Sequence, residues 1–300
     1  MSAVVLVLSG AGLSGVPAAG DIMGTTPPPS GLQASFEDLG YELPAGYIEQ
    51  RTDAVAIFAP SAPGDQTPCL YGLAGRAPST GNLEADAESA LIKTVVPGFR
   101  RLDDRHAAMR GTSPSGWPYA WYRAAFEGNF GGTQQPVNAM AMVLPAGSNR
   151  NHIVWGMGSI ARCLLDDASF EQLFHGLRPA GWTSDGGQAM TRSLLGQWRF
   201  TAGSGIQQLT FKDGGRYDRD LGSRARVGVV EQTAATATGG GFSLRDGQLV
   251  LTPDHRPDNP DRYFARAYEE WFQGGWKPSL ALLDSRAAPP LVVQYYRVEP

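Results

Sequence analysis

The chain has 300 residues and a formal net charge of -4, with 25 Lys and Arg against 29 Asp and Glu. This length predicts two domains, each large enough to bury a core without disulfides or metals. The lack of a basic excess argues against nucleic acid as a partner, because phosphate binding needs clustered Lys and Arg. The high counts of Gly (38) and Pro (22) favour turn-rich β structure over long helices.

Residues 1–30 are predicted to be a signal-like segment followed by a Pro-rich linker. The glycines after residues 4–8 have the spacing of a dinucleotide-binding turn, but Pro17 interrupts the helix that this motif requires. A secretory h-region fits better, with Val16 and Ala18 at the small-residue positions before a cleavage site, although a basic n-region is missing. We therefore expect a periplasmic or secreted bacterial protein. An uncleaved apolar tail is the alternative, and no transmembrane span is expected.

Residues 31–180 are predicted to form an α+β domain, an antiparallel sheet with two helices packed on it. Leu83, Ala87 and Leu91 have helical spacing, Asn82 is a plausible cap and Pro97 ends the segment. A second helix is expected at 166–177. A short strand and turn are expected at 39–47, and further strands at 54–59, 69–74, 100–109, 117–126, 137–144 and 152–157. The short Gly-, Ser- and Asn-containing links between the last four strands indicate antiparallel order.

Three short motifs give this half a resemblance to a known fold. They are Tyr41-x-x-Pro44-x-Gly46-Tyr47, Thr80-Gly81-Asn82-Leu83 and Gly116-Trp117. With the order of elements, they resemble the PsbP-like α/β/α sandwich of photosystem accessory subunits, a nuclear-import factor and many bacterial envelope proteins. The resemblance implies a binding or assembly role without naming a partner.

Residues 181–193 are polar, Gly-rich and aperiodic, and predict a linker. After it, Trp198 and Phe200 share one face of an alternating run, and Leu209 and Phe211 share one face of the next. Gly-containing turns follow both runs, which indicates a hairpin. Further strands are expected at 226–231, 241–244, 248–252, 262–272, 279–283 and 291–298. Since two strands are not stable alone, residues 194–300 are predicted to form a small all-β antiparallel barrel.

The motifs of this last third resemble the lipocalin-type (calycin) barrel. They are Leu195-Gly-Gln-Trp198, Phe211-x-x-x-Gly215-x-Tyr217 and Tyr295-Tyr296-Arg297. The resemblance implies that Trp198 lies at the closed end of the barrel, under Arg297 from the last strand. The segment is shorter than a lipocalin and shows no C-terminal helix. The barrel could therefore hold a ligand or be filled by its own side chains.

Few residues are arranged for chemistry. The four His lack metal-ligand spacing, so neither a metal nor another cofactor is expected. No Ser lies in a nucleophile elbow and neither Cys has a neighbouring His, so no catalytic residue is predicted. Cys69 and Cys163 would form a disulfide in an exported protein, whereas in the cytosol they would be small buried hydrophobes.

The strand expected at 262–272 is the most suggestive binding surface. Phe264, Arg266, Tyr268 and Glu270 share one of its faces and, with Tyr217, form the tentative ligand site. The alternative is that this face lies outside the barrel and is solvated, in which case the opposite face would contribute to the core.

These features predict an exported, non-enzymatic, two-domain binding or assembly protein, whose barrel holds a small apolar ligand or offers a surface to a protein partner. Two alternatives stay open. One is a cofactor-free barrel enzyme, an isomerase or cyclase that uses tyrosine and carboxylate groups on a hydrophobic substrate. The other is a structural envelope module with no ligand.

Overall fold

The computed structural model describes residues 34–61, 69–113, 116–147, 149–160, 163, 168–180, 187–202, 205–227, 230–245, 248–284 and 291–298. The expected signal-like segment and Pro-rich linker lie outside these residues. The fold is mostly β, and the chain divides into two compact units. We call Met1–Ala108 with Ala120–Gly181 the sheet unit, and Met109–Tyr119 with Trp182–Pro300 the barrel unit. No helix among the described residues is long and apolar enough to span a membrane.

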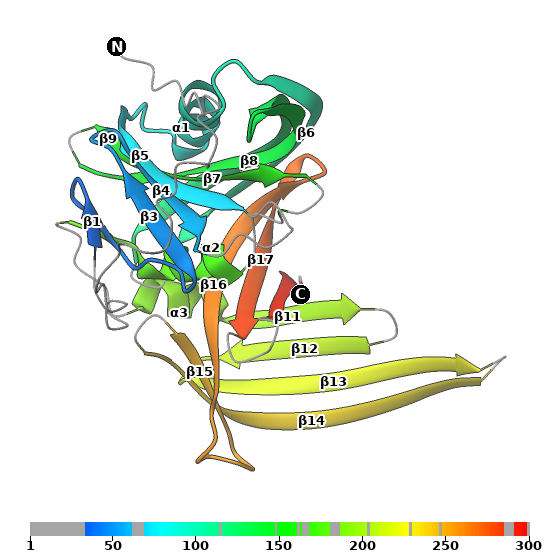
Figure 1. The fold of residues 1–300 in the computed structure, drawn as a ribbon. Coiled ribbons are helices and arrows are strands. Elements are labelled where there is room, and N and C mark those ends of the chain that lie inside the picture. The colour runs from blue at the N-terminus through cyan, green and yellow to red at the C-terminus, as the bar shows by residue number, and fades with distance from the viewer. Residues whose placement is uncertain are drawn as a thin grey trace, which may run out of the picture. The chain divides into compact units, whose positions relative to one another are not determined.

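An antiparallel sheet in the order β6-β7-β8-β9-β5-β4-β3 forms the body of the sheet unit (Figure 1). Its strands are β3 (Tyr47–Arg51), β4 (Val55–Pro60), β5 (Leu70–Pro78), β6 (Arg100–Thr112), β7 (Pro118–Phe130), β8 (Thr133–Pro145) and β9 (Arg150–Ser159). The segment expected at 39–47 forms β2 (Leu39–Tyr41), a turn and the start of β3. The other expected strands occur, and most are longer than the sequence pattern indicates. β7 and β8 are buried along most of their length, as their apolar sequences require.

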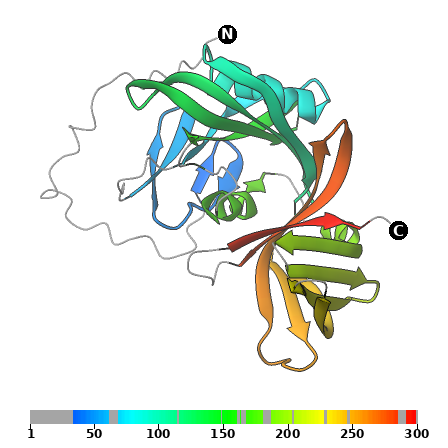
Figure 2. The same cartoon turned by 90° about the vertical axis from the view of Figure 1, so that its right-hand side faces the viewer.

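Two helices cover opposite faces of this sheet (Figures 1 and 2). α1 (Leu83–Ala90) continues as a single π-helical turn, η2 (Leu91–Val95), and the Asn82 side chain caps α1 by accepting from the amide of Ala85 at 3.0 Å. α2 (Ala168–Gly176) packs Phe170 on Trp121, with ring centroids 5.1 Å apart. The next residue of β7, Tyr122, interacts with Glu88 of α1. Because neighbouring strand residues point to opposite faces, the two helices lie on different sides.

The start of the described chain forms a separate small sheet. β1 (Ala34–Phe36) and β2 (Leu39–Tyr41) make a hairpin, and β10 (Arg178–Pro179) pairs with β2. A disulfide joins Cys69, just before β5, to Cys163, after β9. It holds Cys163 next to the start of β5.

The barrel unit is a closed eight-stranded antiparallel barrel in which each strand pairs with the next along the chain. Its strands are β11 (Gly196–Ala202), β12 (Gly205–Lys212), β13 (Arg216–Val227), β14 (Val230–Arg245), β15 (Gln248–Pro253), β16 (Asp261–Phe272), β17 (Gly275–Asp284) and β18 (Leu291–Arg297). Pairing of β18 with β11 closes the barrel. Because the barrel is closed, each of these strands is hydrogen-bonded to a strand on either side over at least part of its length.

Two parts of this unit differ from the sequence expectations. The strand expected at 226–231 is instead the far end of the β13–β14 hairpin, in which Val227 pairs with Val230. The pairing of β12 with β13 ends at Ser223, so the last residues of β13 pair with β14 alone (Figure 1). The expected linker also contains a helix, α3 (Gln188–Leu194), which begins after Gly187 in the left-handed region, at φ 79°.

Candidate ligand-binding site

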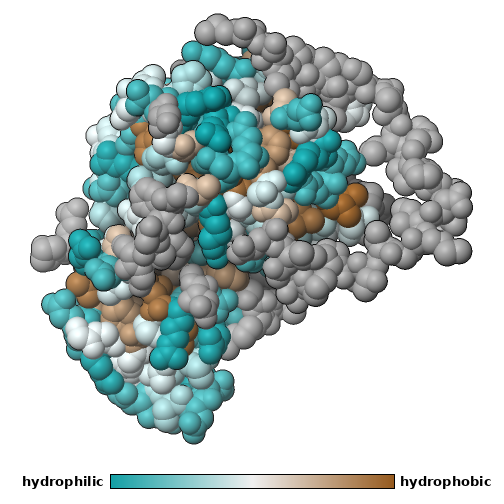
Figure 3. Space-filling view, turned by 90° about the vertical axis from the view of Figure 1, so that its left-hand side faces the viewer, coloured by the Kyte–Doolittle hydropathy of each residue, from teal (hydrophilic) through white to brown (hydrophobic). Residues whose placement is uncertain are grey.

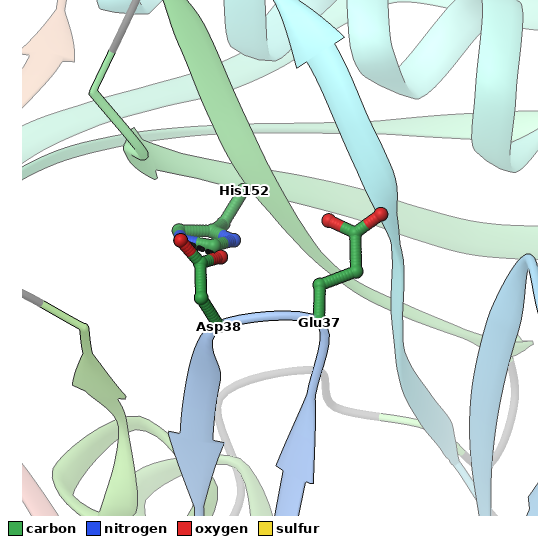
Figure 4. Close-up of side chains that lie close together, drawn as sticks. All are labelled: Glu37, Asp38 and His152. Atoms are coloured by element: carbon green, nitrogen blue, oxygen red, sulfur yellow. Dashed lines mark ion pairs between the residues drawn. The ribbon is translucent and has the colours of Figure 1, made fainter.

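One cluster of acidic and imidazole groups lies in the sheet unit. Glu37 and Asp38, in the β1–β2 turn, and buried His152 of β9 offer ligand atoms within 4.8 Å of one another. Figure 4 shows the Asp38 carboxylate against His152, with a dashed line for their ion pair, and the Glu37 carboxylate to one side of them. Nε2 of His152 lies 3.3 Å from Oδ1 of Asp38. Burial lowers the pKa of His152, and the charge of Asp38 only partly offsets this effect.

Arg76 already forms ion pairs with both carboxylates of this cluster. Its Nε lies 3.1 Å from Glu37 and its Nη2 lies 2.8 Å from Asp38. A divalent cation would have to share these oxygens with a guanidinium, which repels it. The arrangement is therefore better suited to fixing the β1–β2 turn onto β5 and β9 than to binding a metal.

In the barrel unit, one end of the interior is filled by side chains. Met190 and Leu194 of α3 are fully buried in the same core as Trp198 and Phe211. The Trp198 Nε1 donates a hydrogen bond to the carbonyl oxygen of Leu194 at 2.7 Å. α3 and the first barrel strand are thus joined by both packing and a buried hydrogen bond.

Arg297 and Trp198 meet where the first and last strands close the barrel. They are paired in register, and the Arg297 guanidinium carbon lies 5.7 Å from the centre of the Trp198 ring. Nη2 of Arg297 also donates to the carbonyl oxygen of Leu195 at 2.8 Å. Gly196 has φ 116°, and a Cβ there would lie 2.9 Å from Nη2 of Arg297. This close approach explains why glycine precedes the tryptophan by two residues.

Beyond this filled end the barrel contains a cavity of about 220 Å³. Four aliphatic residues and five polar ones line it: Leu209, Leu251, Leu282, Val293, Gln207, Arg219, Tyr263, Asp284 and Tyr295. All belong to the barrel unit and come from strands around the barrel. The cavity is smaller than the roughly 300–1,000 Å³ of most drug-sized sites, so its occupant would be small.

The polar part of the cavity is organised around Arg219 of β13. With the Gln207 amide oriented so that its oxygen faces the guanidinium, this oxygen accepts from both Nε and Nη2 of Arg219 at 2.8 Å. The same amide also lies within hydrogen-bonding distance of the Tyr295 hydroxyl. Burial raises the pKa of Tyr295, and the charge of Arg219 offsets only part of this rise. The phenol is therefore a hydrogen-bond donor at neutral pH.

The tentative ligand residues of β16 lie on a different surface. Alternate residues of this strand, from Tyr263 to Ala267, belong to the barrel core, which places Phe264, Arg266, Tyr268 and Glu270 on the outer face. Arg266 and Tyr268 are buried there, with the guanidinium carbon 4.9 Å from the Tyr268 ring centre. Tyr217 is in the barrel core. The expected pocket is thus not assembled, because closure of the barrel turns the other face of β16 inward.

The cavity residues on β12 and β13 were not predicted from the sequence. Gln207 lies on the same face of β12 as the core residues Leu209 and Phe211. Arg219 lies on the same face of β13 as the core residue Tyr217. This two-residue spacing identifies Arg219 as inward-facing only when the start of β13 at Arg216 is known. Without this boundary, a polar residue in an alternating strand is assigned to solvent.

The described residues on the side drawn in Figure 3 offer no stronger candidate. On the side drawn in Figure 3, hydrophilic residues cover much of the described surface and the apolar ones lie in separate groups. Comparison with known proteins adds no assignment: no protein-family model matches the chain, and no curated protein matches it either. The barrel cavity is therefore the site on which a functional proposal can be based.

Proposed function

We propose that this chain is an exported, non-enzymatic binding protein whose barrel unit holds a small, mostly apolar ligand in the cavity. The observation that carries the proposal is the cavity itself, with aliphatic walls formed by residues such as Leu209 and Leu251 and a polar group at Arg219. Ligand sites in proteins combine apolar walls with a few orienting polar groups in this way.

Two features support a lipocalin-like assignment for the barrel unit. The strands follow one another around a closed antiparallel barrel, and Arg297 packs over Trp198 at the junction of the first and last strands. Both agree with the resemblance of the Gly-x-Trp and Tyr-Tyr-Arg motifs. A barrel that served only as a structural module would gain packing energy by filling the space with larger side chains.

The polar groups beside Arg219 suit ligand binding better than proton abstraction. An isomerase or cyclase without a cofactor needs a group that accepts a proton near neutral pH. The raised pKa of Tyr295 keeps this phenol protonated, so it can orient a ligand but cannot abstract a proton. The Gln207 amide beside it does not titrate, so among the described lining residues a catalytic base would have to be the Asp284 carboxylate.

Export and a role in assembly are proposed for the chain as a whole. The Cys69–Cys163 disulfide supports an oxidising compartment, because such bridges are rare in reducing ones. The two-sided helical cover of the sheet unit supports a PsbP-like α/β/α arrangement, a fold that resembles known binding and assembly modules. The signal-like start of the sequence supports the same location.

The binding function can be tested by filling the cavity. Isothermal titration calorimetry with octan-1-ol should show binding to the native chain and its loss in Val293→Phe, because Val293 lines the cavity. Val292→Phe is the matched control, since the neighbouring residue of β18 points to the opposite face. Native mass spectra of the purified chain should show a bound small molecule. Equal octanol binding by both variants would contradict the proposal, and so would a native chain that bound neither octan-1-ol nor any small molecule in the native mass spectra.

A further inference from the structure

Arg219 presents an unusual donor pattern to the barrel cavity. Its Nε and Nη2 are parallel donors that form the edge of a guanidinium fork, yet both point at the single amide oxygen of Gln207. The geometry of this edge matches the two oxygens of a carboxylate, which a neutral amide oxygen does not reproduce. The fork is therefore only partly used.

The positive charge of Arg219 is also weakly compensated in the described part of the chain. Its ion-pair contact is with Asp261, where Nη1 and Oδ2 are 4.0 Å apart. Arg256 holds the same oxygen at 2.7 Å and is the closer partner. Asp284 also lines the cavity, but the ion pair of Arg219 within the described residues is the one with Asp261. A half-buried cation of this kind favours an anion as a partner.

Donors for the second oxygen of such an anion lie beside the fork. The Tyr295 hydroxyl is about 3 Å from the Gln207 amide, and the amide nitrogen is itself a donor. Aliphatic residues Leu209, Leu282 and Val293 form the rest of the wall. The cavity thus has a polar part with several donors and an apolar part without them.

We infer that the ligand is a small carboxylate with an apolar body, whose head group takes the place of the Gln207 amide on the Nε–Nη2 edge of Arg219. The inference rests on the proposed binding function and adds the chemical class of the ligand. Binding exchanges a neutral acceptor for a charged bidentate one, and it leaves Gln207 and Tyr295 to donate to the carboxylate.

The test compares three probes with the same eight-carbon chain: octanoate, octan-1-ol and octylammonium. Calorimetry on the full chain should show octanoate binding at least about tenfold more tightly than octan-1-ol. Arg219→Gln should weaken octanoate binding by about 10- to 100-fold and change octan-1-ol binding by less than about threefold. Arg219→Lys should give an intermediate loss, because it keeps the charge and removes the fork.

Arg216→Gln is the matched control, since Arg216 lies on the same strand, is exposed and pairs with Asp254 on the surface. It should leave the affinity for all three probes unchanged. Circular dichroism of each variant shows whether the fold is retained, and the comparison of probes on the native chain needs no variant at all. Asp284→Asn should leave octanoate binding unchanged or tighter.

Each contrary result has a distinct meaning. Equal affinity for octanoate and octan-1-ol, or an Arg219→Gln variant that binds octanoate normally, would overturn the carboxylate assignment while the binding function stands. Tightest binding of octylammonium, lost in Asp284→Asn, would show that the head group is a cation. Failure of the native chain to bind any probe would contradict the binding function itself.

Discussion

Asp86 is a buried carboxylate in the first turn of α1. Its two oxygens accept hydrogen bonds that hold the preceding loop in place. It receives hydrogen bonds from the Ser79 hydroxyl at 3.0 Å, the Thr80 hydroxyl at 2.7 Å and the Asn151 amide at 2.8 Å. Burial alone would raise the pKa of Asp86, but the bonds from Thr80, Asn151 and Ser79 outweigh it and hold the pKa below its ordinary value. The ionised form is thus stabilised by folding.

The lowered pKa predicts a pH dependence of stability. A carboxyl whose pKa falls on folding contributes stability above its unfolded pKa of about 3.9, and this contribution is lost as the pH falls through the folded pKa. Asp86→Asn should lower the free energy of unfolding at pH 7 by about 1–3 kcal/mol, and part of the acid sensitivity below about pH 4 should disappear. Urea titrations at pH 7 and pH 3 measure both effects. Glu84→Gln, in the same helical turn, is the control, and an equal loss there would point to the helix dipole instead.

Trp198 and Arg297 lead to a second prediction for single residues. A guanidinium over an indole at an exposed position contributes about 0.5–1 kcal/mol, so a double-mutant cycle between these positions should give a coupling energy of that size. Trp198→Ala should cost more, about 3–5 kcal/mol, because it also opens a cavity in the core. Exposed Arg199 on the same strand should show no coupling to Trp198. A zero coupling for Arg297 as well would mean that its contact with the ring does not stabilise the closure.

Among the elements, α3 has a role that its length does not suggest. It has seven residues, but Met190 and Leu194 are spaced four apart and both lie in the barrel core. Leu194→Ala should therefore destabilise the barrel by about 2–5 kcal/mol, whereas Arg192→Ala, on the exposed side of the helix, should change stability by less than about 0.5 kcal/mol. Chemical denaturation followed by tryptophan fluorescence distinguishes them. Similar small effects would indicate that α3 rests on the barrel without belonging to its core.

The same elements show what sequence patterns can and cannot predict. α1 was predictable because Asn82 caps it and its apolar spacing is regular, and β16 because its alternation is long. α3 was missed because two helical turns among Gly and polar residues carry too little periodicity. β14 contains the run 239–241 of three glycines and several small residues, so its alternation is weak.

The candidate site was harder to predict than the fold. Arg266 and Arg219 both alternate with apolar or aromatic residues, and the sequence alone does not show which of them faces inward. The direction is set by barrel closure, which pairs β11 with β18 about 100 residues away in the chain. Local patterns predict that a strand has two faces, and only the long-range pairing identifies the inner one.

For the whole molecule, the division into two units does not follow a single cut in the chain. Met109–Tyr119 belongs to the barrel unit, although the surrounding parts of β6 and β7 belong to the sheet unit. β6 pairs with β16 there, with Gly111 opposite Tyr268, and Nε of Arg110 lies 2.7 Å from Glu269. A fragment that ends near residue 181 would therefore carry a strand of the barrel unit with it.

This topology predicts the behaviour of a chain cut between its units. A protease site inserted within residues 181–186 should give two fragments that still elute together in size-exclusion chromatography, because β6 remains paired with β16. They should separate only in denaturant. Gly111→Val should weaken the complex, since a Cβ at Gly111 would lie 2.9 Å from the carbonyl oxygen of Ala267. Gly131→Val, in the β7–β8 turn where a Cβ meets no atom within 4 Å but φ is 63°, controls for the general cost of replacing a glycine. Separation of the native fragments without denaturant would show that the paired strand is not enough to hold the barrel unit together.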